Sequence, residues 1–170
     1  MKILRNKHEM AAQFALWKKA GLRIGIVPTM GNLHNGHLSL LDVLDARADK
    51  IITTIYVNPL QFAPGEDFNE YPRTHEEDFA KLHETGKCDA IFIPEQMYED
   101  GHATTIQPAG VALGYETEFR PHFFEGVATI VHKLFQQTGA DIAVFGEKDY
   151  QQLQVIKQMV TDLDLPVEIL

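Results

Sequence analysis

Two histidines, His34 and His37, lie three residues apart in this chain, with Gly36 directly before the second. An apolar run over 22–27 precedes them and an amphipathic run over 38–48 follows. This pattern predicts a junction where a buried strand leads into a helix. Backbone N–H groups and the helix dipole favour phosphate at such a junction, and imidazoles there can stabilise charge on a leaving pyrophosphate. The spacing therefore indicates a nucleotide-handling site.

Two other interpretations of this pair stay open. The histidines could be surface residues of an ordinary turn, since the motif is only four residues long. The interpretation as a zinc site is weaker, because no cysteine or third histidine lies at a suitable spacing nearby.

A pair of side-chain amides, Asn58 and Gln61, directly follows the β-branched run 51–57. Their donors and acceptors suit a polar uncharged substrate or one that carries a carboxylate. The alternative is a turn that the asparagine side chain satisfies. The loop over 58–73 is long for a connection, which indicates a functional or disordered segment.

A third polar segment follows the apolar run 142–145 and contains Gly146, Lys148, Asp149 and Gln152. Lys148 could neutralise phosphate charge, or it could be an ordinary solvated lysine. Asp149 could cap the next helix or accept hydrogen bonds from ribose hydroxyls. Gln152 could complete a capping box with Asp149 or face a substrate.

Strand-like and helix-like runs alternate along the chain. This alternation predicts an α/β fold, with a mostly parallel sheet and helices on both faces. Thr74 and Glu77 have the spacing of a capping box at a helix start. Because each polar segment follows a buried strand, all three should meet at one edge of the sheet. The expected helices are 10–20, 37–48, 74–86, 126–137 and 149–163, and the expected strands are 22–29, 51–57, 90–93, 104–106, 142–145 and 167–170.

Length and composition limit the function classes. The chain of 170 residues fits a single domain, and its formal net charge of −9 argues against nucleic acid as a partner. No apolar run approaches the roughly 20 residues that span a bilayer, and the N-terminus lacks a signal-peptide core. A single cysteine, Cys88, excludes an internal disulfide and fits a reducing cytoplasm. A nucleotide site in such an acidic chain needs locally concentrated cations.

Six blocks of the sequence resemble the pantothenate synthetase (pantoate–β-alanine ligase) family, in the order that the family has them. The blocks are PTMG (28–31), HNGH (34–37), VNPLQF (57–62), YPRT (71–74), GVAT (126–129) and GEKDYQQ (146–152). The resemblance runs from about residue 21 to residue 170, and HNGH is similar to the HIGH motif of nucleotidylyltransferases. It implies a Rossmann-like fold and ATP-dependent condensation of pantoate with β-alanine through pantoyl adenylate, with release of AMP and pyrophosphate.

The resemblance also implies the site residues. His34, His37 and Lys148 would be catalytic and bind the ATP phosphates, with Gly36 beside them. Mg²⁺ would arrive with ATP, and the metal ligands stay unassigned. The protein would be a cytoplasmic homodimer. The adenosine site would be lined by Pro28, Met30, Gly146 and Asp149, the pantoate site by Gln61 and Gln152, and the β-alanine or loop side by Asn58 and Tyr71.

Two departures accompany the resemblance. The family usually has RPGHFRGV where this chain has RPHFFEGV (120–127), so Phe123 stands at the usual histidine position and His122 one place early. Thr117 stands where the family has glycine. The family also continues into a smaller C-terminal domain that closes over ATP, so residues 1–170 are expected to form an N-terminal ATP- and pantoate-binding domain with little activity alone.

Alternatives to this function are another HIGH-type nucleotidylyltransferase, which transfers AMP to a phosphate, and a non-catalytic dimerisation or ligand-binding module. Gln61 and Gln152, in place of more basic residues, favour a carboxylate substrate over a phosphate.

Overall fold

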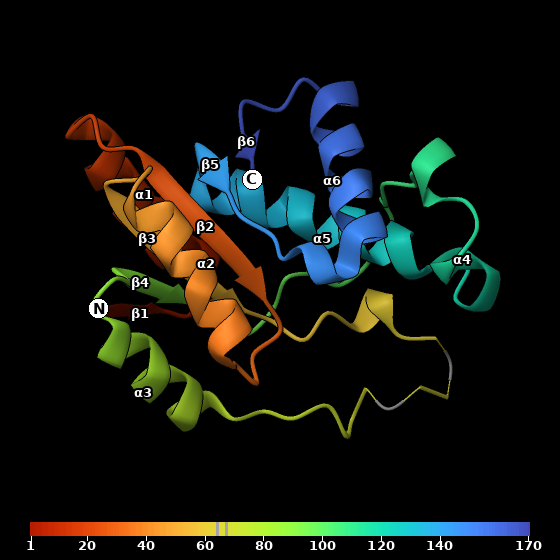
Figure 1. Ribbon diagram of the computed structural model, residues 1–170, viewed down its shortest axis with the longest axis horizontal. Helices are drawn as coiled ribbons and strands as arrows, with labels where there is room; N and C mark the ends of the chain where they lie inside the picture. The colour runs from red at the N-terminus through yellow and green to blue at the C-terminus, as the bar shows by residue number, and fades with distance from the viewer. Residues whose placement is uncertain (64, 67) are drawn as a thin grey trace.

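A six-stranded sheet forms the centre of the molecule in a computed structural model that describes residues 1–63, 65–66 and 68–170 (Figure 1). The strand order is β1-β4-β3-β2-β5-β6, and each pairing among the described residues is parallel. The predicted α/β fold with a parallel sheet is therefore confirmed. The strands are β1 (Lys2–Leu4), β2 (Ile24–Thr29), β3 (Lys50–Ile55), β4 (Ala90–Phe92), β5 (Ile142–Ala143) and β6 (Glu168–Ile169).

Helices cover both faces of this sheet, as parallel strands that are apolar on both sides require (Figure 1). On one face α1 (Lys7–Lys19), α5 (Phe123–Thr138) and α6 (Tyr150–Asp162) pack on strand residues such as Ile26 and Phe92. On the other, α2 (Asn35–Asp45) and α3 (His75–Thr85) pack on residues such as Val27 and Ile91. The shorter elements are α4 (Glu116–Phe119) and the 3₁₀ turns η1 (Pro59–Gln61), η2 (Gly110–Ala112) and η3 (Glu147–Asp149).

Two local predictions were wrong, and one strand was missed. The segment 104–106 is not a strand, since the Ile106 N–H donates to Thr129 Oγ1 of α5 (2.9 Å) instead of joining the sheet. Strand β1 was missed because its three residues show little periodicity, and its edge position depends on β4. The capping box at Thr74 does not form, and the Thr74 hydroxyl contacts Asp78 instead of capping α3.

The order of the strands creates one place where the chain changes direction across the sheet. From β2 the chain runs outward through β3 to β4, and it then returns to place β5 on the other side of β2. Ligands of open α/β sheets bind at such a switch point, beyond the carboxyl ends of the strands. The three polar segments follow β2, β3 and β5, which are neighbours in the sheet, so they share one edge as predicted. None of the helices in the described part of the chain is both long and apolar enough to cross a membrane.

Candidate active site

The loop between β2 and α2 presents the two histidines at the start of a helix. His34 is the N-cap of α2, and its Nδ1 accepts from the Gly36 N–H (3.1 Å), while His37 Nδ1 accepts from the His34 N–H (3.4 Å). The two ring centroids lie 4.2 Å apart. Because Nδ1 is the acceptor in both rings, each neutral imidazole carries its proton on Nε2 and can donate from there. A side chain at Gly36 would contact the His34 ring at about 2.9 Å, which explains the glycine.

The environment of His37 favours its neutral form. Partial burial lowers the pKa of His37, and the neighbouring His34 lowers this pKa further. Lys148 also lowers it, whereas Asp78 and Asp149 raise it. The η3 turn that follows β5 is therefore close enough to influence the imidazole through its charges. An unprotonated His37 offers one N–H donor to a phosphate and can gain a proton when negative charge arrives.

A buried aspartate that sequence analysis did not identify holds this loop in place. Asp78 of α3 is fully buried, and its carboxylate accepts from the backbone N–H groups of Asn32 (2.9 Å) and Leu33 (2.7 Å). It also accepts from the Thr74 hydroxyl at 3.2 Å. The available signal was an acidic residue in the first turn of α3, but the capping-box interpretation assigned that importance to Glu77. Asp78 therefore positions the segment that leads into His34.

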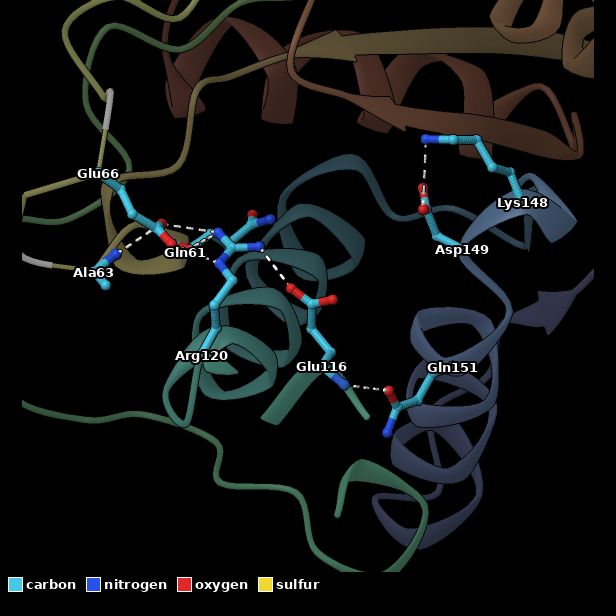
Figure 2. Close-up of polar contacts among 8 residues, drawn as sticks. All are labelled: Gln61, Ala63, Glu66, Glu116, Arg120, Lys148, Asp149 and Gln151. Atoms are coloured by element: carbon cyan, nitrogen blue, oxygen red, sulfur yellow. Dashed lines mark hydrogen bonds and ion pairs between the residues drawn. The ribbon is translucent and has the colours of Figure 1, made fainter. Parts of the chain in front are cut away.

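The segment after β5 is exposed and charged. The Lys148 side chain is 90% exposed and its Nζ lies 3.7 Å from Asp149 Oδ1, as Figure 2 shows. Asp149 is the N-cap residue of α6, yet its side chain makes no capping hydrogen bond. The expected capping box with Gln152 is thus absent, and Gln152 lies half-buried in the first turn of α6. A Cβ at Gly146 would meet open space, so the turn leaves room for a ligand.

The remaining predicted nucleotide contacts lie at the end of β2. Pro28 belongs to this strand and Met30 follows it directly, and both residues are half-buried. Because β2 and β5 are paired neighbours, Pro28 and Met30 belong to the same edge of the sheet as Gly146. Their proposed contact with adenosine remains a prediction.

The amides after β3 are already hydrogen-bonded within the protein. Asn58 is 0% exposed, and its Nδ2 donates to Gln61 Oε1 (2.9 Å) and to the carbonyl of Gly126 (3.0 Å). Gly126 permits this close packing of η1 on α5, since a Cβ there would lie 2.3 Å from the Leu60 carbonyl oxygen. Asn58 therefore supports Gln61, in line with the turn interpretation of this residue. Its predicted role beside β-alanine remains a prediction.

Tyr71 lies at the far end of the same connection. Its half-buried ring packs edge-on against Phe62, with the centroids 6.0 Å apart. Burial raises the pKa of Tyr71, and the nearby Asp78 raises it further. The hydroxyl is thus a neutral hydrogen-bonding group near the loop that Asp78 holds.

Among the residues that the structure describes, no three His, Cys, Asp or Glu side chains are grouped so that they could hold a metal ion. Within those residues, the histidine pair has no further ligands of the kind that a zinc site needs. The arrival of Mg²⁺ with ATP stays a prediction.

The comparisons with known proteins agree with this geometry. The family model described as pantoate-beta-alanine ligase matches residues 2–170. The chain belongs to this family. It is 52% identical to pantothenate synthetase from Caulobacter vibrioides over 170 residues, which cover 99% of this chain and 59% of that protein. The corresponding protein of Hyphomonas neptunium is 48% identical, with 100% of this chain and 58% of the relative covered.

Solved structures of the family superimpose closely on the whole chain. The Thermus thermophilus pantothenate synthetase matches with a TM-score of 0.90 at 43% identity, over 100% of this chain and 60% of that one. The Francisella tularensis pantoate-beta-alanine ligase, in complex with beta-gamma ATP and beta-alanine, matches with a TM-score of 0.91 at 36% identity. The match covers 100% of this chain and 66% of that one. The chain thus spans about 60% of the length of the family members it matches.

The segment 120–127, where sequence analysis predicted a departure from the family pattern, is organised around Arg120. Its guanidinium contacts both Glu66 oxygens (2.8 and 3.0 Å) and Glu116 (2.9 Å), and it donates to the backbone carbonyl of Gln61 (2.7 Å), as Figure 2 shows. The Phe123 ring centroid lies 4.2 Å from the guanidinium carbon. Phe123 therefore stacks on the arginine that holds the Gln61 backbone carbonyl.

The neighbouring departures lie away from these contacts. The His122 side chain is 84% exposed, and its nearest charged partner is Glu125 at 3.8 Å. Thr117 directs its hydroxyl to the carbonyls of Ala112 (2.9 Å) and Gly114 (3.1 Å), which fixes the turn before α4. The His122 side chain is thus largely exposed to solvent and lies outside the hydrogen bonds of Arg120.

Proposed function

We propose that this chain binds ATP and pantoate and contributes them to a pantoate–β-alanine ligase reaction that passes through pantoyl adenylate. The observation that carries this proposal is the position of the two charged loops. The segments with His34 and His37 and with Lys148 follow β2 and β5, the two strands at the switch point of a sheet that belongs to the ligase family. Because the chain spans about 60% of its relatives, ligand binding is proposed for the chain and the complete reaction for the ligase.

In the first step a pantoate carboxylate oxygen attacks the α-phosphorus of ATP. The new acyl O–P bond replaces the bond from phosphorus to the pyrophosphate oxygen, and pyrophosphate leaves with the negative charge. His34 and His37 donate from Nε2 to the phosphate oxygens, and the Lys148 ammonium balances their charge. This step needs in-line placement and electrostatic stabilisation, and it needs no nucleophile from the protein.

The nucleotide and its metal occupy the edge of the sheet near β2 and β5. Pro28, Met30, Gly36 and Gly146 line the adenosine and phosphate region, and Asp149 accepts from ribose hydroxyls. Mg²⁺ enters as part of the MgATP substrate. The phosphates supply the hard oxygen ligands that Mg²⁺ prefers, which supports this assignment.

Pantoate binds between the segments that follow β3 and β5, where Gln61 and Gln152 hydrogen-bond its carboxylate and hydroxyls. In the second step the β-alanine amine attacks the acyl carbon, the C–N bond forms, and AMP leaves with the electrons of the C–O bond while the amine loses a proton. Asn58 and Tyr71 border the region that β-alanine reaches. The complex of the Francisella tularensis ligase with beta-gamma ATP and beta-alanine supports ATP and β-alanine as ligands.

Two measurements test the proposal. Calorimetry with ATP and with pantoate should show binding of both by the chain. In the complete ligase, pyrophosphate exchange into ATP should require pantoate. Exchange that proceeds with a phosphorylated acceptor and not with pantoate would support a different nucleotidylyltransferase. A dimer in light scattering that releases no heat with either ligand would support a dimerisation module and overturn the ligase assignment.

A further inference from the structure

A chain of hydrogen bonds starts outside the proposed site and ends on a proposed pantoate contact. The Tyr98 hydroxyl donates to Asn58 Oδ1 at 2.7 Å. The other end of the same amide, Asn58 Nδ2, donates to Gln61 Oε1 at 2.9 Å. Tyr98 lies after β4, 40 residues from Asn58 in sequence, so only the fold brings the three side chains together.

The donors and acceptors around Asn58 allow only one orientation of its amide. Oδ1 faces two donors, the Tyr98 hydroxyl and the more distant Leu60 N–H (3.4 Å). Nδ2 faces the Gly126 carbonyl, which can only accept. A flipped amide would place Oδ1 against that carbonyl, and because Asn58 is fully buried, bulk solvent could not compensate.

The fixed asparagine in turn sets the orientation of Gln61. Because Asn58 offers only N–H donors on that side, Gln61 must turn its Oε1 inward. Its Nε2 then points away from Asn58, and it has no hydrogen-bond partner among residues 1–63, 65–66 and 68–170. Arg120 holds the Gln61 backbone carbonyl from another side (Figure 2). Gln61 thus presents a donor, and not an acceptor, to a ligand.

The neighbouring side chains hold the Tyr98 ring in place. Its ring packs against Tyr56 and His102, with centroids 6.4 and 4.8 Å away, and the Lys133 ammonium lies 5.4 Å from its centroid. Burial raises the pKa of Tyr98, and the neighbouring Tyr56 raises it further. The hydroxyl therefore keeps its proton across the range in which enzymes work.

We propose that Tyr98 is a positioning residue for pantoate recognition, which acts through Asn58 to hold the Gln61 carboxamide with its N–H group toward the substrate. The inference rests on the proposed function and adds to it a reason why the site would prefer pantoate over other ligands. The N–H donor of Gln61 selects a ligand with an oxygen acceptor, such as a carboxylate or hydroxyl, at that position. A site that presents a fixed donor discriminates against analogues that lack the acceptor.

The test compares Tyr98→Phe with Tyr56→Phe in the same chain. Both variants lose one hydroxyl from the same aromatic pair, but of these two hydroxyls it is that of Tyr98 that donates a hydrogen bond to Asn58. By calorimetry we expect the Kd for pantoate to rise about tenfold in Tyr98→Phe, as for one misaligned hydrogen bond, and to change less than about twofold in Tyr56→Phe. The Kd for ATP should stay the same in both variants. A purely structural role would instead affect both ligands.

The outcomes separate this inference from the proposed function. Wild-type chain that does not bind pantoate overturns the function and the inference with it. Wild-type chain that binds pantoate, with equal Kd values for the two variants, overturns the role of Tyr98 alone.

A second measurement needs no variant and no ligand, and it applies even if Tyr98→Phe fails to fold. In the NMR spectrum of the wild-type chain, the Asn58 carboxamide protons should be protected from solvent exchange and the Gln61 carboxamide protons should exchange rapidly. Protection of both Gln61 protons would contradict the proposed orientation.

Discussion

The two halves of the proposed site are built in opposite ways. The charged side, made of His34, His37, Lys148 and Asp149, is largely exposed, and Lys148 reaches 90% exposure. The amide side, made of Asn58, Gln61, Tyr98 and Arg120, is half-buried or buried and joined by hydrogen bonds of 2.7 to 2.9 Å. The charged side thus leaves its charged groups exposed to solvent, whereas hydrogen bonds within the protein fix the orientation of the side chains on the amide side.

This difference follows from what each side is proposed to bind. A triphosphate carries several negative charges. Exposed cations and N–H donors can therefore reorient towards it by electrostatic attraction once water is excluded. A neutral amide distinguishes ligands only when its donor and acceptor ends are fixed in advance, which requires burial and full pairing. Substitutions on the charged side should therefore slow the reaction. Those on the amide side should lower both the stability of the fold and the affinity for pantoate.

The largest effect is expected on the charged side. In the complete ligase, His37→Ala and Lys148→Ala should each slow pantoate-dependent pyrophosphate exchange by about 10²- to 10³-fold, because a donor or cation on the leaving pyrophosphate is lost. The free energy of unfolding of Lys148→Ala, from urea titration, should match that of wild type, since the side chain is exposed. Lys157→Ala, an exposed lysine of α6, is the control. Unchanged exchange in both variants would refute the assigned roles.

The next effect concerns the stability of the amide side. Asn58→Ala removes the acceptor of the Tyr98 hydroxyl and one of the donors to the Gly126 carbonyl, and it should lower the free energy of unfolding by about 1–3 kcal/mol. Pantoate binding should weaken with it, while ATP binding persists. Denaturant titration and calorimetry measure both, with Asn69→Ala, in the same connection but less buried, as the control. Equal stability of the two variants would show that burial of Asn58 contributes nothing.

A smaller effect is expected from pH. Burial and His34 lower the pKa of His37, so the free protein holds this imidazole neutral at pH 7. Bound phosphate favours the protonated ring and raises that pKa, so ATP should bind about three- to tenfold more tightly as pH falls from 8 to 6. Calorimetry in two buffers of different ionisation heat would report the proton uptake. His37→Gln should flatten this dependence relative to wild type, and an equally steep dependence would exclude His37 as its source.

The smallest effect belongs to the ion pair at the edge of the amide side. The hydrogen bonds from Arg120 lower the pKa of the Glu66 carboxyl below its ordinary value. The stabilisation is therefore present above the unfolded-state pKa and is lost as pH falls through the lower folded-state pKa. Glu66→Gln should lower the Tm slightly at pH 7 and less in high salt, because the pair is partly exposed. Glu70→Gln is the exposed control, and an equal Tm change there would show that the pair is not responsible.

The sequence alone was sufficient to predict the alternation of strands and helices and to identify the residues that could bind phosphate. These signals are local, because apolar periodicity and polar residues at strand ends follow from the chain's own order. The placement of the His34, Gln61 and Lys148 segments at one edge also followed, since parallel strands align their carboxyl ends. The prediction of a strand over 104–106 failed because a short β-branched stretch cannot indicate whether a strand or a helix will accept its hydrogen bonds.

The tertiary structure decided which side chains support the site. Asp78 contacts Leu33 from 45 residues away, Tyr98 contacts Asn58 from 40, and Arg120 contacts Glu66 from 54. None of these pairs has a periodic signature, because each depends on how helices and loops pack on the finished sheet. The sequence thus determined the chemical groups at the strand ends, and the packing decided which were left exposed to meet charge and which were buried and fixed in orientation.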